Sequence, residues 1–145
     1  MTKPVENQAV FTATVEELPN ICQLIHEAAV EHGMDEASVW KLETAVDEAC
    51  TNIASYGYCG RNDGLIWLKW GSHPDGFYVV IEDEGVPFDQ TMPTQPDFTS
   101  ELCKRKAGGL GRFIMRQFVD ELDYQRNNDR NTLTLIKKLH DHSSK

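Results

Sequence analysis

Residues 43–59 read Glu-Thr-Ala-Val-Asp-Glu-Ala-Cys-Thr-Asn-Ile-Ala-Ser-Tyr-Gly-Tyr-Cys, and the rest of the chain is organised around this stretch. Apolar residues recur through it and just before it at the spacing i, i+3, i+4, i+7, which predicts an amphipathic helix with one face on a core. Glu48 and Asn52 stand four residues apart, so they share one face of that helix. Such a pair can hold a proton acceptor and a metal ligand side by side. The spacing also fits an ordinary solvated helix face, so it does not decide between the two by itself.

Composition limits the classes to which this chain can belong. Its 145 residues fit one domain, and we expect a single domain over 1–145 with an ordered core at about 9–139. No apolar run approaches the length of a bilayer span, and the N-terminal residues lack the apolar core of a signal peptide, so we expect a cytoplasmic protein that binds no membrane. The net charge of -9 argues against nucleic acid as the main partner, because phosphate binding needs a basic surface.

Local patterns predict the other elements. Residues 9–15 alternate as in a strand, and residues 16–31 keep a helical apolar stripe that Gly33 ends. Asp35 or Ser38 can cap the next helix, which contains Glu48. Four further strands are predicted in two pairs, at residues 65–71 with 77–83 and at residues 121–125 with 132–139.

Residues 83–87, Asp-Glu-Gly-Val-Pro, place an acidic residue at the end of an apolar strand. A carboxylate there is costly to bury unless a ligand or hydrogen bonds satisfy it. The amino group of adenine donates hydrogen bonds of the kind that a carboxylate accepts, and Gly85 lets the backbone approach a flat base closely. A strand that simply ends in an acidic, glycine-containing turn is the alternative.

The stretch Gly108-Gly109-Leu110-Gly111 opens a predicted helix after a long loop, at about 90–107, that shows no periodicity. Unobstructed backbone amides at a helix N-terminus form an anion site suited to phosphates. The glycines match neither the Rossmann nor the P-loop spacing, and a flexible loop with its helix cap stays open as the alternative. A loop of this length in a compact domain tends to be functional, for instance as a lid.

The three motifs are more specific together than singly. In chain order they are E-x-x-x-N on a helix, D-x-G-x-P after a strand, and G-G-x-G on a helix after a long loop. This order resembles the GHKL superfamily of ATP-binding domains, which includes gyrase, heat-shock chaperones, histidine kinases and mismatch-repair proteins. Within it, A-V-D-E-A-C-T-N-I at 45–53, D-E-G-V-P-F-D at 83–89 and G-G-L-G-R-F-I-M at 108–115 look most like the anti-sigma-factor serine kinase branch.

The resemblance implies an α+β fold, a two-layer α/β sandwich with a mixed, mostly antiparallel sheet and helices on one face. It implies that Mg-ATP binds between the helix of Glu48 and the lid, with Glu48 as general base and the Asn52 oxygen on a Mg²⁺ ion that bridges the phosphates. Asp83 would hold the adenine amino group. The other nucleotide-binding residues implied are Gly85 and Pro87 beside the base, Gly108, Gly109, Leu110, Gly111 and Arg112 around the phosphates, and Thr132 near the adenine.

The function implied by the resemblance is an ATP-dependent serine/threonine protein kinase. It would phosphorylate an anti-sigma factor antagonist of the STAS type, would also sequester a sigma factor, and would act as a homodimer. The first alternative is an ATP-binding interaction module without significant kinase activity, which the presence of Glu48 disfavours because a pure binder needs no base. The second alternative is an interaction domain that binds no nucleotide.

Overall fold

The computed structural model describes residues 6–59, 61–87, 89, 91 and 115–138. A 3-10 turn (Val15–Glu17) precedes α1, a π-helical turn (Ile53–Gly57) continues α2, and residues 115–118 form one further helical turn. In chain order the main elements are β1 (Glu6–Thr12), α1 (Leu18–Glu31), α2 (Glu36–Asn52), β2 (Leu65–His73), β3 (Gly76–Asp83), β4 (Glu121–Asn127) and β5 (Arg130–Lys138).

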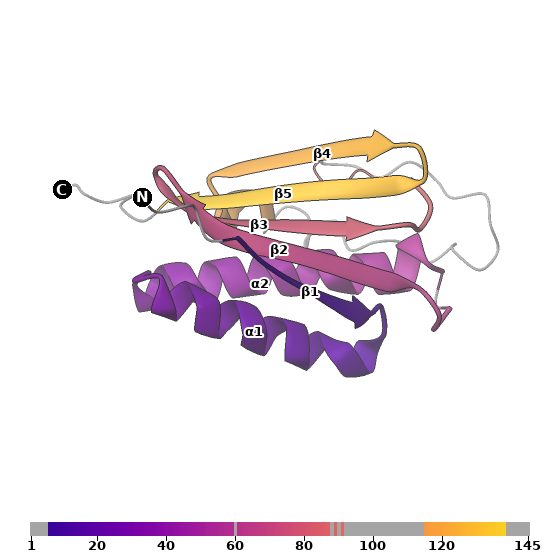
Figure 1. Ribbon diagram of the computed structural model, residues 1–145, viewed down its shortest axis with the longest axis horizontal. Coiled ribbons are helices and arrows are strands. Elements are labelled where there is room, and N and C mark those ends of the chain that lie inside the picture. The colour runs from indigo at the N-terminus through magenta and orange to yellow at the C-terminus, as the bar shows by residue number, and fades with distance from the viewer. Residues whose placement is uncertain (1–5, 60, 88, 90, 92–114, 139–145) are drawn as a thin grey trace.

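The strands form one sheet in the order β1-β2-β3-β5-β4. Every neighbouring pair is antiparallel, so the sheet is antiparallel throughout the described strands, where we had expected a mixed but mostly antiparallel one. Helices α1 and α2 lie together along one face of this sheet (Figure 1). The predicted two-layer α+β architecture is therefore confirmed.

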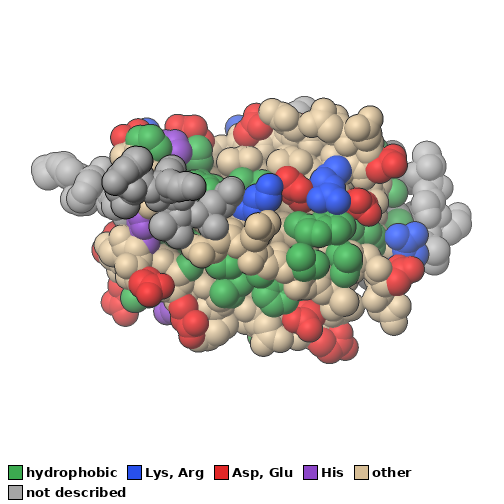
Figure 2. All heavy atoms as spheres, viewed as in Figure 1, with side chains coloured by type: hydrophobic (Ala, Val, Ile, Leu, Met, Phe, Trp, Pro, Cys, Tyr) green, Lys and Arg blue, Asp and Glu red, His purple; other side chains and the backbone are tan. Residues whose placement is uncertain are grey.

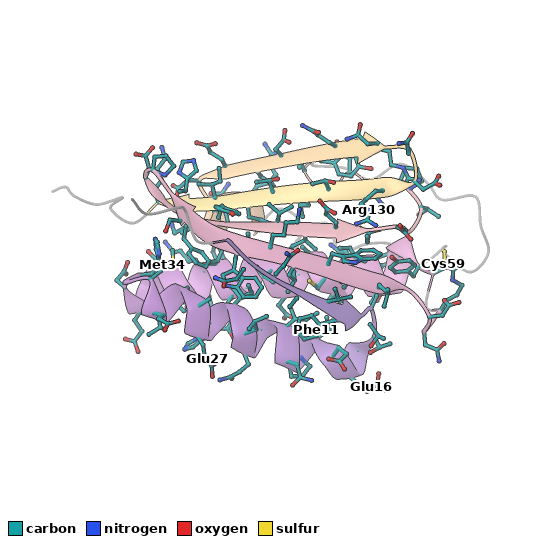
Figure 3. All side chains as sticks on the ribbon, viewed as in Figure 1. Phe11, Glu16, Glu27, Met34, Cys59 and Arg130 are labelled. Carbon is teal, nitrogen blue, oxygen red and sulfur yellow. The ribbon has the colours of Figure 1, made fainter. Side chains whose placement is uncertain are left out.

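The core lies between the two layers. Strands alternate buried and partly exposed side chains, as a sheet with one covered face requires. Acidic side chains such as Glu16 and Glu27 extend from the helix layer away from the sheet, whereas Arg130 lies among the strands (Figure 3). The largest fully buried side chains are Phe77, Ile21, Ile25, Leu42, Ile66, Leu68, Ile81, Met115, Leu135, Val39, Val46 and Val79.

The first strand, β1, begins and ends earlier than the predicted range of residues 9–15. β1 spans Glu6–Thr12 because these residues pair in register with β2, from Glu6 opposite Gly71 to Thr12 opposite Leu65. Beyond Thr12 the chain leaves the ladder after a hydrogen bond from the Ala13 amide to the Gly64 carbonyl, 2.9 Å long. Alternation alone did not reveal this register, because pairing with a distant strand sets it.

The start of α2 is fixed by its cap. Of the two residues predicted for this role, Asp35 is the N-cap, and its carboxylate accepts a hydrogen bond from the Ser38 amide at 3.3 Å. Hydrogen bonding from Ser38 holds the pKa of Asp35 below its usual value. Gly33, just before the cap, has a φ of 99°, a conformation that favours glycine.

The end of α2 widens into the π-helical turn Ile53–Gly57, in which the Tyr58 amide donates to the Ile53 carbonyl at 2.9 Å. Turns of this kind occur frequently at functional sites. Within the described residues, no helix combines the length and the apolar character needed to cross a bilayer.

Candidate nucleotide site at the end of β3

Asp83 ends β3 as a buried carboxylate with only 4% of its surface exposed. Its Oδ1 accepts hydrogen bonds from the Gly85 amide at 2.8 Å and from Asn131 Nδ2 at 2.9 Å. Among the described residues, no hydrogen bond to Oδ2 is present. Burial raises the pKa of Asp83, against the opposing effect of the hydrogen bonds from Asn131 and Gly85 and of the nearby Arg126 and Arg130. One carboxylate oxygen is thus fixed by the protein, and the other is left as an acceptor.

Gly85 lies where the loop after β3 meets the end of the helix layer. A Cβ atom at this position would come within 2.4 Å of the Gly57 carbonyl oxygen, closer than real Cβ contacts. The Val86 amide also donates to the Gly57 carbonyl at 2.8 Å. The described structure therefore shows a close approach of Gly85 to the π-helical turn, and the close approach to a base expected from the sequence stays a prediction.

Glu48 and Asn52 lie on the last two turns of α2, as the four-residue spacing predicts. Asn52 is the final residue of the helix and is 2% exposed, and Glu48 is half-buried. A Cβ atom at Gly57 would lie 3.7 Å from Asp83 Oδ1, so the chain just after α2 is in contact with the end of β3. The fold therefore brings the end of the Glu48–Asn52 helix to the buried carboxylate.

Thr132 does not join this group. Antiparallel pairing sets Asp83 opposite Asn131 and sets Thr132 opposite Glu82, one residue along, so Thr132 projects from the other face of the sheet. Asn131 is 5% exposed and contacts Asp83 directly. The sequence contained the signal for this placement, because Leu133 and Leu135 alternate with polar residues and so share a strand face with position 131, the face that the structure buries.

Sequence reasoning also missed Tyr58. Its hydroxyl group donates to the Leu65 carbonyl and accepts from the Glu84 amide, both at 2.7 Å. Its ring packs against Gly64, where a Cβ atom would be 2.5 Å from ring carbons. Tyr58 therefore anchors the loop after β3 to the beginning of β2.

The structure says less about the other predicted site residues, most of which it does not describe. Pro87 is exposed in the loop that follows Gly85. Residues 108–112, which hold the glycines expected to bind phosphate, lie outside the described residues. So does nearly all of the expected lid at about 90–107, of which only Thr91 is described.

Comparison with known proteins places this geometry in a family. The model described as "Histidine kinase-like ATPase domain" matches residues 11–137. The chain is 33% identical over 92 residues to the serine-protein kinase RsbW of Bacillus velezensis, a match that covers 59% of this chain and 56% of that protein. It is 32% identical over 107 residues to the anti-sigma F factor of Priestia megaterium, which covers 72% of this chain and 71% of that protein.

A solved structure agrees on the fold. The crystal structure of the RsbU and RsbW domains of Rv1364c from Mycobacterium tuberculosis superposes with a TM-score of 0.65 at 18% identity, over 95% of this chain and 33% of that chain. The resemblance expected from residues 45–53, 83–89 and 108–115 is confirmed. The chain therefore belongs to the histidine kinase-like ATPase domain family, in the branch that contains the anti-sigma F factors and the RsbW serine-protein kinases.

Proposed function

We propose that this protein is an ATP-dependent serine/threonine kinase that phosphorylates a small antagonist protein, an anti-sigma factor antagonist of the STAS type. The observation that carries the proposal is the buried Asp83, which keeps one oxygen as an acceptor beside the end of the helix that bears Glu48 and Asn52. Relatives named serine-protein kinase and anti-sigma factor support it.

In this proposal the adenine amino group donates to Asp83, and the phosphates extend toward α2. Gly85 and Pro87 belong to the loop beside the base, and Gly108, Gly109, Leu110, Gly111 and Arg112 bind the phosphates. Backbone amides and one guanidinium suit that role because phosphate oxygens accept several hydrogen bonds at once.

The donor set at the end of α2 suits Mg²⁺. Asn52 offers an amide oxygen from a rigid helix, and Mg²⁺ prefers oxygen ligands and retains waters and phosphates in the rest of its shell. When bound, the ion would neutralise phosphate charge. Asn52 would hold it against the nucleotide.

Glu48 would act as the general base. As the serine or threonine hydroxyl of the substrate attacks the γ-phosphoryl group, the Glu48 carboxylate accepts the hydroxyl proton and ADP leaves. Phosphoryl transfer depends mainly on positioning and on charge neutralisation, so a single base on a rigid helix is sufficient protein chemistry.

We further propose that the protein sequesters a sigma factor in the cytoplasm and that it works as a homodimer. Apolar side chains on the sheet face that no described helix covers support the dimer. Val10 is 54% exposed and pairs with Trp67 on this outer face. Figure 2 shows hydrophobic side chains gathered beside basic and acidic ones. Light scattering on the purified chain should give twice the mass of one chain. A mass of one chain would overturn the dimer.

The kinase proposal is tested by incubating the protein with ATP labelled at the γ-phosphate, magnesium and candidate antagonist proteins. We expect label to appear on a serine or threonine of one antagonist. Tight binding of ATP without transfer to any antagonist would favour the ATP-binding interaction module instead, and no binding of ATP would overturn both.

A further inference from the structure

Asn131 lies in a buried hydrogen-bond network between β3, β4 and β5. Its Nδ2 is 2.9 Å from Asp83 Oδ1, 3.1 Å from the Val86 carbonyl oxygen and 3.4 Å from the Gly85 carbonyl oxygen. All three neighbours accept hydrogen bonds, and none can donate one while Asp83 is ionised. The amide orientation is therefore fixed, because the reversed amide would bring Asn131 Oδ1 against three oxygens.

The neighbouring strand β4 supplies a hydrogen-bond donor to the oxygen of the same side-chain amide. Tyr124 places its hydroxyl 2.5 Å from Asn131 Oδ1, and since an amide oxygen only accepts, Tyr124 donates. Two residues along the same strand, Arg126 donates from Nη1 to the Gly85 carbonyl at 2.8 Å. The direction of donation runs from Tyr124 through Asn131 to Asp83 and ends on a carboxylate.

We propose that Asn131 is a positioning residue for base selection. By occupying Asp83 Oδ1, it leaves Oδ2 as the acceptor for a base, which favours an amino group over a carbonyl group at that point. Adenine presents the amino group there and guanine presents a carbonyl oxygen, so the network selects adenine. This inference rests on the proposed nucleotide site.

The charge state of Asp83 follows the same network. Burial raises the pKa of Asp83, and the hydrogen bond from Asn131 is the largest of the effects that lower it. The Gly85 amide, Arg126 from β4 and Arg130 from β5 also lower the pKa of Asp83. The Asp83 carboxylate in turn helps to raise the pKa of Cys50 on α2 and of Tyr58 after the π-helical turn. Loss of the Asn131 donor therefore moves the pKa of Asp83 further upward, and a protonated Asp83 no longer offers a full carboxylate to the base.

The test compares Asn131→Leu with Thr134→Val, a control on the same strand that faces the other side of the sheet. ATP and GTP affinities are measured by equilibrium binding with magnesium over a series of pH values. Asn131→Leu should weaken ATP binding by about tenfold, the effect of one lost hydrogen bond to a charged group, and should narrow the preference for ATP over GTP. The pH at which ATP affinity is half lost on acidification should rise. Thr134→Val should change none of these values.

The outcomes separate the two claims. If the wild-type protein binds no ATP, the proposed function fails and the inference with it. If the wild type binds ATP but a folded Asn131→Leu protein keeps its affinity, its base preference and its pH midpoint, the inference alone is overturned. Should Asn131→Leu not give a cooperative unfolding transition, Tyr124→Phe is measured instead. It removes the donor to Asn131 Oδ1 and should move the same three quantities in the same direction by a smaller amount, and unchanged values would overturn the inference.

Discussion

At the scale of single residues, Asp83 is a buried carboxylate whose hydrogen bonds within the described residues both fall on one oxygen. Its cost of burial is reduced by two donors on Oδ1, the Gly85 amide and Asn131, yet its pKa stays above the ordinary value of 3.8. The remaining oxygen is the part of the site that a donor on a ligand would complete.

Asp83→Asn should separate binding from stability. The new Oδ1 can still accept from Gly85 and Asn131, which places the new Nδ2 where Oδ2 was and sets a donor against the adenine amino group. We expect ATP affinity to fall by about tenfold or more, with no loss of thermal stability. Equilibrium binding and thermal unfolding of the same samples measure both, and an unchanged affinity would remove Asp83 from the adenine site.

The pH dependence of the same variant has a definite sign. Because the pKa of Asp83 is raised on folding, the folded protein binds this proton more tightly than the unfolded chain does. Ionisation of Asp83 therefore lowers the free energy of unfolding at neutral pH. This destabilisation disappears as the pH falls through the raised pKa. The stability of Asp83→Asn relative to the wild type should be highest at neutral pH and should decline on acidification. A constant difference would contradict the assignment.

Sequence reasoning reached Asp83 because an acidic residue after an apolar strand is costly without a partner. It placed Thr132 near the adenine through the family resemblance, without applying the alternation of Leu133 and Leu135 that puts Asn131 on the covered face beside Asp83. Tyr124 could not be predicted, because its contact with Asn131 depends on the pairing of β4 with β5.

At the scale of elements, α2 joins the fold to the candidate site. Its N-terminus is set by the Asp35 cap, and its C-terminus continues through the π-helical turn to Gly57, which contacts the loop after β3. The helix, its cap and the strands β2, β3, β4 and β5 were predictable from local periodicity and capping residues. The π-helical turn and the Gly57–Gly85 contact were not, since both arise where two distant segments meet.

Gly85→Ala should destabilise the protein by roughly 1–3 kcal/mol, because its Cβ atom would overlap the Gly57 carbonyl and force the backbone to shift. Gly57→Ala is the matched control. Its Cβ atom would meet neighbours no closer than 3.7 Å, which is ordinary contact. Chemical denaturation of both variants gives the comparison, and equal stabilities would contradict the close packing of Gly85 on the turn.

Asp35→Ala should cost about 1 kcal/mol of unfolding free energy through loss of the helix cap. The pKa of Asp35 is lowered in the fold, so the stabilisation by its carboxylate is present above the unfolded pKa and is lost as the pH falls through the folded one. Denaturation at neutral and at acidic pH checks this. A difference between wild type and variant that persists unchanged in acid would contradict a cap made by the carboxylate.

At the scale of the whole molecule, the two layers carry different residues of the candidate site. The helix layer carries Glu48 and Asn52, and the sheet carries Asp83 and the Asn131 network that fixes it. The contacts of Gly57 with Gly85 and Val86 join the layers at this point. Phosphoryl transfer by this chain would therefore depend on how firmly the end of α2 is held to the end of β3.

The central claim is that Glu48 takes the proton during phosphoryl transfer, and Glu48→Gln tests it most directly. ATP affinity and the rate of phosphate transfer to the antagonist are measured on the same samples, beside Asp47→Asn, which removes an exposed carboxylate from the adjacent position. We expect Glu48→Gln to bind ATP as the wild type does and to lose transfer by at least about 100-fold, the usual contribution of a general base, while Asp47→Asn retains both. Transfer at the wild-type rate by Glu48→Gln would contradict the account.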